Sequence, residues 1–113
     1  MEKITYLNSD TLGNGSEELG KILIRNFLLT VPADETVKIK SIFLVNGAVR
    51  LACENSHVLD AMSEFAAAGV KIYSCGTCLD YYGLKDKLKA GEPGNMKLLC
   101  SNLADENIHV IRP

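Results

Sequence analysis

The feature that most constrains the fold is a continuous apolar run, Ile42-Phe43-Leu44-Val45, which ends a segment rich in β-branched residues that begins at Val37. A strand with one solvated face alternates apolar and polar residues, whereas a strand covered on both faces can be apolar throughout. Asn46-Gly47 breaks the run. We therefore predict a central, fully covered strand over Val37–Val45.

Strand-like and helix-like segments alternate on either side of this run. The other predicted strands are Ile4–Leu7, Val70–Ser74 and Ile108–Ile111. The predicted helices start at Ser16, Ser56, about Leu79 and Asn95, with Pro32, Gly69 and Pro93-Gly94 as breaks. The order β-α-β-α-β-α-α-β predicts an α/β fold, a three-layer sandwich in which a mostly parallel sheet carries helices on both faces.

Helical spacing predicts which side chains of three helices face the core. In the first helix these are Leu19, Ile22, Leu23 and Phe27. In the second they are Val58, Leu59, Met62, Phe65 and Ala66, and in the last Met96, Leu99, Cys100 and Leu103. Cys100 is therefore expected to be a core residue.

Composition narrows the class of protein. A chain of 113 residues, 47% of them hydrophobic, suits one domain spanning 1–113. A net charge of −2 argues against nucleic acid as a partner, and no apolar stretch approaches the roughly 20 residues of a membrane span. The first residues lack a secretory signal pattern, so we expect a cytoplasmic protein with reduced cysteines.

The segment Cys75-Gly76-Thr77-Cys78 is the strongest candidate for chemistry, because it lies where a predicted strand runs into a helix. Backbone N–H groups and the helix dipole at such a turn stabilise a thiolate, which is the reactive form of cysteine. We predict that Cys75 is the nucleophile and that Cys78, one helical turn later, can resolve a persulfide or disulfide formed there. Gly76 allows a substrate to approach the backbone closely.

Two further loops, 8–16 and 46–55, follow strands and should converge with the cysteine segment at the carboxyl edge of the sheet. In the first, Asn8 and Asp10 are predicted to order the loop near the cysteines, and Gly13 to adopt a left-handed backbone. This loop has neither the glycine spacing nor the lysine of a phosphate-binding loop. The predicted supporting residues are Asn8, Asp10, Gly13, Asn46, Gly47, Gly76 and Thr77.

Other uses of the cysteines have weaker support. A structural zinc site commonly takes two close ligand pairs, and this chain has one, with Cys53, His57, Cys100 and His109 as the other soft ligands. We therefore predict no metal and no cofactor. Two half-buried structural cysteines remain an alternative for the pair, and no Ser, His and Asp pattern indicates a hydrolase.

Several segments together resemble the YedF proteins linked to selenium metabolism, specifically their C-terminal DsrE-like domain. The segments that carry this resemblance are Leu7–Gly13, Glu18-Leu19-Gly20, Asn46–Val49, Cys75–Tyr82, Asn95-Met96 and Val110–Pro113. The resemblance covers nearly the whole chain. It implies a DsrE/DsrF-like fold and a relay in which a cysteine, here Cys75 or Cys78, carries persulfide sulfur or selenium between donor and acceptor proteins.

The resemblance also concerns partners. YedF proteins typically carry an additional TusA-like domain, which is not present in this chain, so a separate TusA-like protein is an expected partner. DsrE-like proteins are commonly oligomers, and a homodimer or homotrimer is expected. Three functions stay open from the residues: a sulfur carrier, a CxxC dithiol oxidoreductase, and a non-enzymatic module that binds a partner or ligand.

Overall fold

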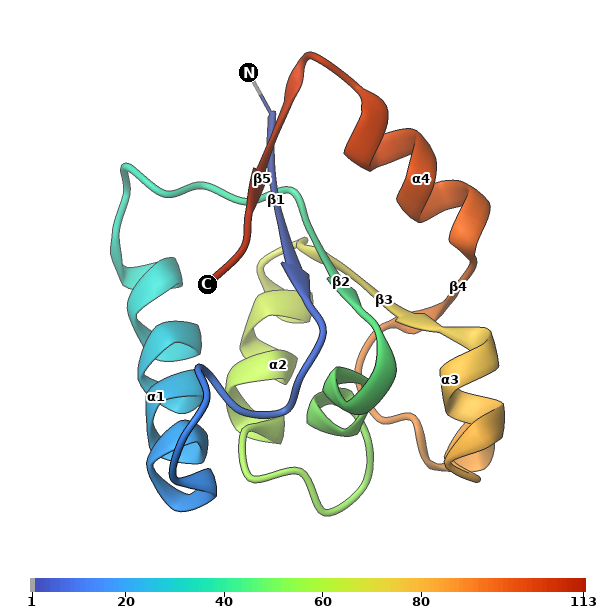
Figure 1. Cartoon of the computed structure of the whole chain (residues 1–113). Coiled ribbons are helices and arrows are strands. Elements are labelled where there is room, and N and C mark those ends of the chain that lie inside the picture. Colours follow the sequence, from blue (N-terminus) through green and yellow to red (C-terminus); the bar gives the residue numbers. More distant parts are fainter. Residues whose placement is uncertain (1) are drawn as a thin grey trace.

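Residues 2–113, which the computed structural model describes, form one sheet of five parallel strands (Figure 1). The strands are β1 (Glu2–Leu7), β2 (Ser41–Leu44), β3 (Lys71–Cys75), β4 (Glu92–Gly94) and β5 (Ile108–Ile111), in the order β4-β3-β2-β1-β5. The central strand β2 is buried along its whole length. The predicted α/β class is confirmed.

Within the described part of the chain, four α-helices connect the strands: α1 (Glu17–Thr30), α2 (Leu59–Ala67), α3 (Gly76–Tyr81) and α4 (Met96–Ala104). Two begin at the predicted caps, since Ser16 Oγ accepts from the Leu19 N–H and Asn95 Oδ1 from the Leu98 N–H. Three short 3-10 helices are Val31–Ala33, Asn46–Ala52 and Lys85–Lys87. No helix within residues 2–113 has the length and apolar character needed to cross a bilayer.

Some predicted boundaries were wrong. The stretch 37–40 precedes β2 instead of belonging to it, after a turn in which the Asp34 carboxylate accepts from the N–H and hydroxyl of Thr36. Helix α3 begins at Gly76, three residues before the predicted Leu79. Pro93-Gly94 lies in β4, at the edge of the sheet, where the missing N–H of proline costs no interior hydrogen bond.

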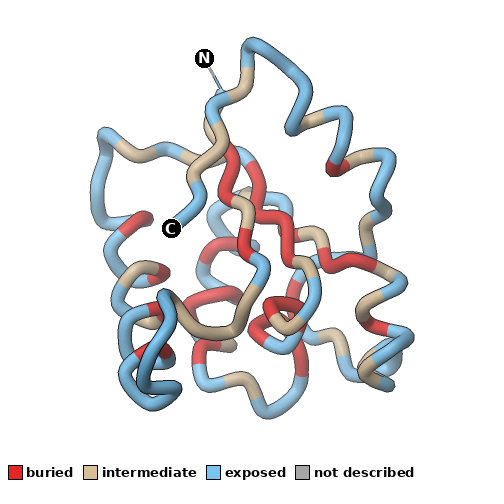
Figure 2. Tube along the Cα trace, viewed as in Figure 1, coloured by how far each residue is buried: buried red, intermediate tan, exposed pale blue. Residues whose placement is uncertain are grey.

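The order of the strands places helices on both faces of the sheet. Strands β1, β2, β3 and β4 lie side by side in chain order, so right-handed crossovers place α1 and α2 on one face of the sheet. The connection from β4 to β5 crosses the sheet in the opposite direction and therefore places α4 on the other face. The main core lies between the sheet and the α1–α2 layer (Figure 2). Helix α3 lies at the carboxyl edge of β3, beside the Asn46–Ala52 segment.

The face that carries α4 has a much smaller apolar contact. Of the described residues, three that are buried and apolar lie outside the main core cluster: Ile4, Phe43 and Leu99. Leu99 is the only buried residue of α4. The prediction that Met96, Cys100 and Leu103 face the core was wrong, because all three are exposed and the helix packs mainly through Leu99.

Helix α1 is buried on a different side from the one predicted. Gly20, Ile24 and Leu28 face the core, whereas Leu19 and Ile22 are 52% and 51% exposed. Leu23 is exposed as well, and Phe27 is half-buried. The helix is apolar around most of its circumference, so its periodicity does not specify which side meets the sheet.

Helix α2 buries most of the predicted side chains, but it begins at Leu59, three residues after the predicted start at Ser56. Val58, Met62 and Phe65 are buried, and Gly69 ends the helix with φ +90°. Leu59 is half-buried, while Ala61 replaces the predicted Ala66 on the buried side.

Candidate functional site

The two cysteines of the Cys75–Cys78 segment lie on either side of the junction between β3 and α3. Cys75 is the last residue of β3 and the residue that precedes the first turn of α3, and Cys78 is the third residue of that helix. A residue before a helix and the third residue inside it face each other across the first turn. The two side chains are therefore neighbours, and neither is in a disulfide.

Burial distinguishes the two sulfurs. Cys75 is 5% exposed and belongs to the main core cluster, whereas Cys78 is half-buried. Cys78 also lines an open hollow of about 450 Å³ together with Asn46, Thr77, Tyr81 and Tyr82. Sequence reasoning placed the nucleophile on Cys75, but the accessible sulfur of the pair is that of Cys78.

The predicted convergence of the three loops is confirmed at two points. The backbone N–H of Asn46, which follows β2, donates to Cys78 Sγ at 3.1 Å. A Cβ atom added to Gly47 would lie 4.0 Å from the backbone nitrogen of Asp10, in the loop after β1. The carboxyl ends of adjacent parallel strands bring these segments together.

Burial raises the pKa of the Cys78 thiol above its ordinary value. The hydrogen bond and the charge of the neighbouring Cys75 act in the same direction, and the Asn46 N–H opposes them. The Cys75–Cys78 segment predicted that the start of a helix stabilises a thiolate, but α3 has only six residues. At Cys78 burial has the largest effect on the pKa, and it favours the thiol. Thiolate formation at Cys78 depends on the few groups that favour the charged sulfur.

Sequence reasoning missed three residues around Cys78: Arg50, Tyr81 and Tyr82. The Tyr82 hydroxyl donates to Asn46 Oδ1, and Arg50 Cζ lies 4.2 Å from the centre of the Tyr82 ring. Tyr81 is 83% exposed, and its ring meets Tyr82 edge to face. The signal that could have found the two tyrosines is their position directly after the cysteine motif, because the helix that carries Cys78 also presents them.

The loop after β1 is ordered by residues other than the predicted ones. Ser9 Oγ accepts from the Thr11 N–H at 3.1 Å and bonds to the Thr11 hydroxyl at 3.0 Å. Asn8 is exposed, and Gly13 has the predicted left-handed backbone with φ +82°. Neither Asn8 nor Gly13 lines the hollow around Cys78.

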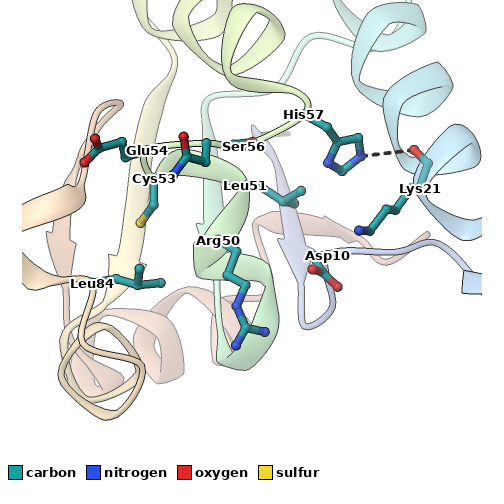
Figure 3. Close-up of a pocket in the computed structure, with 10 residues that line it drawn as sticks. Asp10, Lys21, Arg50, Leu51, Cys53, Glu54, Ser56, His57 and Leu84 are labelled. Carbon is teal, nitrogen blue, oxygen red and sulfur yellow. Dashed lines mark hydrogen bonds between the residues drawn. The ribbon is translucent and has the colours of Figure 1, made fainter. Parts of the chain in front are cut away.

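Arg50 also lines a second cavity, of about 310 Å³ (Figure 3). Its lining includes charged and polar side chains from four segments: Asp10, Lys21, Arg50, Glu54, Asn55, Ser56 and His57. The His57 ring bonds through Nε2 to the Lys21 carbonyl at 3.2 Å, as the dashed line shows. Arg50 therefore borders both this cavity and the Tyr82 ring beside Cys78.

The remaining candidate ligands do not gather around the cysteine pair. Cys53 is buried, its Sγ donates to the Val49 carbonyl, and burial raises its pKa. Within residues 2–113, no three side chains among His, Cys, Asp and Glu are grouped so that they could hold a metal ion.

Comparison with known proteins identifies the fold. No family model matches the chain, and no curated protein sequence matches it. The ychN protein of E. coli superposes with a TM-score of 0.70 at 15% identity, covering 97% of this chain and 98% of that one. MTH1491 of Methanobacterium thermoautotrophicum, a protein of unknown function, superposes with a TM-score of 0.70 at 20% identity, covering 99% and 98%. Both have DsrE/DsrF-like folds, and so has this chain.

Proposed function

We propose that the protein is a sulfur relay protein that carries sulfane sulfur, or selenium in its place, as a persulfide on Cys78. The observation that carries this proposal is the accessibility of Cys78 in an open hollow at the carboxyl edge of a parallel sheet. Small-molecule sites in such sheets gather at this edge. The fold agrees with the resemblance to the YedF proteins, whose cysteine motif matches Cys75 and Cys78.

The transfer step balances without an external oxidant or reductant. The Cys78 thiol gives up its proton, and the thiolate attacks the terminal sulfur of a donor persulfide, R–S–SH. A new S–S bond forms at Cys78 while the donor S–S bond breaks, and the donor leaves as a thiolate that takes up one proton. An acceptor thiolate then attacks the outer sulfur in the same way and releases Cys78.

Mass spectrometry of the intact protein tests the proposal. After incubation with a cysteine desulfurase and cysteine, the protein should gain the mass of one sulfur atom, and this adduct should disappear in Cys78→Ser. Cys100→Ser, which removes the exposed cysteine of α4, should keep the adduct and serves as the matched control. If Cys78→Ser still gains the sulfur, or if the wild-type protein gains none, the proposal is wrong for this class of donor.

A dithiol oxidoreductase is the second candidate, because the side chains of Cys75 and Cys78 are neighbours. In that function the pair would cycle between dithiol and disulfide, with oxidation of the pair coupled to reduction of a substrate disulfide. Measuring the reduction potential of the pair and its reduction of insulin distinguishes this function from a relay. A purely binding module is the third candidate, and full biological activity of a Cys75→Ser, Cys78→Ser variant would favour it.

The proposed partners are a sulfur donor and an acceptor protein, with a TusA-like protein as one of them, in the cytoplasm. Tyr81, beside Cys78, suits such contacts, because exposed tyrosines are frequent at the centre of protein interfaces.

We further propose that the protein forms a homo-oligomer through the outer side of α1. That side carries Leu19, Ile22, Leu23 and Leu29 with Asn26 and Thr30 and no charged residue, so it can be buried against a copy of itself without desolvating a charge. Light scattering coupled to size exclusion should give a mass above the 12.3 kDa of one chain. A Leu19→Glu, Ile22→Glu variant should give the mass of one chain, and a wild-type protein of 12.3 kDa would contradict the proposal.

A further inference from the structure

Asn46 has a backbone conformation that residues with side chains rarely adopt. Its φ of +54° lies in the left-handed region, which glycine enters without steric cost and which asparagine tolerates better than most other residues. Asn46 is the first residue of the Asn46–Ala52 segment, directly after β2 and Val45. A conformation of this kind persists when surrounding contacts hold it.

In this conformation the backbone N–H of Asn46 donates to Cys78 Sγ at 3.1 Å. A hydrogen bond to a charged acceptor is stronger than one to a neutral acceptor, so this N–H favours the thiolate over the thiol. It opposes the burial and the Cys75 neighbour, which both favour the thiol. The backbone at Asn46 therefore affects how readily Cys78 ionises.

Tyr82 holds the side chain of Asn46 from the opposite element. Its hydroxyl donates to Asn46 Oδ1, and its ring lies under the Arg50 guanidinium, with Cζ 4.2 Å from the ring centre. Asn46 belongs to the segment after β2, and Tyr82 directly follows α3, the helix that carries Cys78. One side-chain hydrogen bond thus connects the segment that follows β2 with the residue that follows α3.

We propose that Asn46 and Tyr82 are positioning residues for Cys78: the Tyr82 hydroxyl fixes Asn46 in its left-handed conformation and so keeps the Asn46 N–H on the sulfur. The thiolate that this N–H stabilises is the nucleophile when sulfur arrives and the leaving group when sulfur is passed on. The catalytic importance of the network rests on the proposed relay function, whereas its effect on the ionisation of Cys78 does not.

The test is the pH dependence of alkylation of Cys78 by iodoacetamide, which reports the thiolate fraction. The charged and titratable groups in the elements around Cys78 include Cys75, Arg50, Tyr81, Tyr82 and the Asp80–Lys85 ion pair. The variants are made in a Cys75→Ser, Cys100→Ser protein. The first substitution removes the thiol next to Cys78, and the second removes the exposed thiol that would compete for iodoacetamide. Labelling of the peptide that carries Cys78 is then followed by mass spectrometry.

In this background, Tyr82→Phe should move the midpoint of Cys78 alkylation upward by about one pH unit, because it removes the hydroxyl and leaves the ring under Arg50. Tyr81→Phe is the matched control, since it removes an exposed hydroxyl from the adjacent ring, and it should leave the midpoint unchanged. Circular dichroism of each variant verifies that it is folded. An unchanged midpoint in Tyr82→Phe would overturn the proposal.

Two substitutions at Asn46 separate its backbone from its side chain. Asn46→Gly keeps the backbone N–H, and glycine adopts the left-handed conformation freely. The midpoint of Cys78 alkylation should therefore equal that of the Cys75→Ser, Cys100→Ser protein, and adding Tyr82→Phe should no longer change it. Asn46→Ala disfavours that region and should shift the midpoint upward as Tyr82→Phe does. Equal shifts in the glycine and alanine variants would overturn the proposal. No sulfur donor takes part, so this outcome is independent of whether the protein accepts sulfur.

Discussion

The backbone nitrogen of Asn46 lies 3.1 Å from Cys78 Sγ, so a residue that follows β2 directly contacts the sulfur carried by α3. These residues are 32 positions apart in the sequence, and the parallel pairing of β2 with β3 brings them together. Cys78 consequently contacts a backbone hydrogen-bond donor, neighbours the buried Cys75 and lines an open hollow. Four further predictions concern the thiols, α4, β4 and the contact between α1 and α2.

The four cysteines should react with iodoacetamide in an order set by their exposure. Cys100 is exposed and should be modified first, followed by the half-buried Cys78. Cys75 and Cys53 are buried and react only when the structure opens locally, so Cys53 should react at least about tenfold more slowly than Cys100. Peptide fragmentation mass spectrometry over a time course measures each rate. Modification of Cys75 before Cys78 would contradict the assignment of Cys78 as the accessible sulfur.

Leu99→Ala should destabilise the protein by about 2–5 kcal/mol, because Leu99 is the only buried residue of α4. Met96→Ala on the same helix is the control; Met96 is 54% exposed, and its loss should change stability by no more than about 0.5 kcal/mol. Urea denaturation followed by circular dichroism gives both free energies. Equal losses in the two variants would mean that α4 is not held by this one side chain.

Gly91→Ala should cost more stability than Gly83→Ala. Both glycines have a left-handed backbone, with φ +77° and +66°, so the conformational strain of alanine is similar at the two sites. A Cβ on Gly91 would also lie 2.6 Å from Ile72 Cβ and overlap the Ile72 carbonyl, whereas none of the described atoms lies within 4 Å of a Cβ on Gly83. We expect an additional loss of about 1–3 kcal/mol, measured by urea denaturation. Similar losses would show that β4 can shift away from β3.

Asp60→Asn should lower the melting temperature at neutral pH, because it removes the carboxylate charge and one of the two oxygen atoms that accept from Arg25 and link α1 to α2. Those hydrogen bonds from Arg25 are the largest cause, followed by the Ala61 backbone N–H, of a pKa of Asp60 that is lowered from 3.8 to about 2. A pKa that is lower in the folded state adds stability above the unfolded value, and this stability is lost as the pH falls. The difference in melting temperature should therefore shrink between pH 3.8 and about pH 2.

Asp86→Asn is the control for Asp60→Asn, since Asp86 makes no ion pair among the described residues. It should leave the pH profile of the melting temperature close to that of the wild-type protein. A difference between Asp60→Asn and the wild-type protein that persists unchanged at pH 2 would show that the carboxylate charge is not what stabilises the contact.

Short-range patterns predicted the order of most elements. The caps at Ser16 and Asn95 and the end of α2 at Gly69 depend on interactions within a few residues. The run in β2 could be recognised because consecutive apolar residues indicate a strand that is covered on both faces. The sequence therefore determined the α/β order and located the cysteine segment at the end of a strand. Strand β4 was missed because three residues, one of them proline, are too few to show a strand period.

The tertiary structure alone decided which side chains are accessible. Cys100 and Leu19 lie on apolar stripes of their helices, yet both are exposed, because burial depends on what packs against a helix and not on its periodicity. The same holds for the cysteine pair. The sequence determined that Cys75 and Cys78 share one turn, but the packing of β2 beside β3 buried Cys75 and left Cys78 in the hollow with Asn46 and Tyr82, since that packing joins residues far apart in the chain.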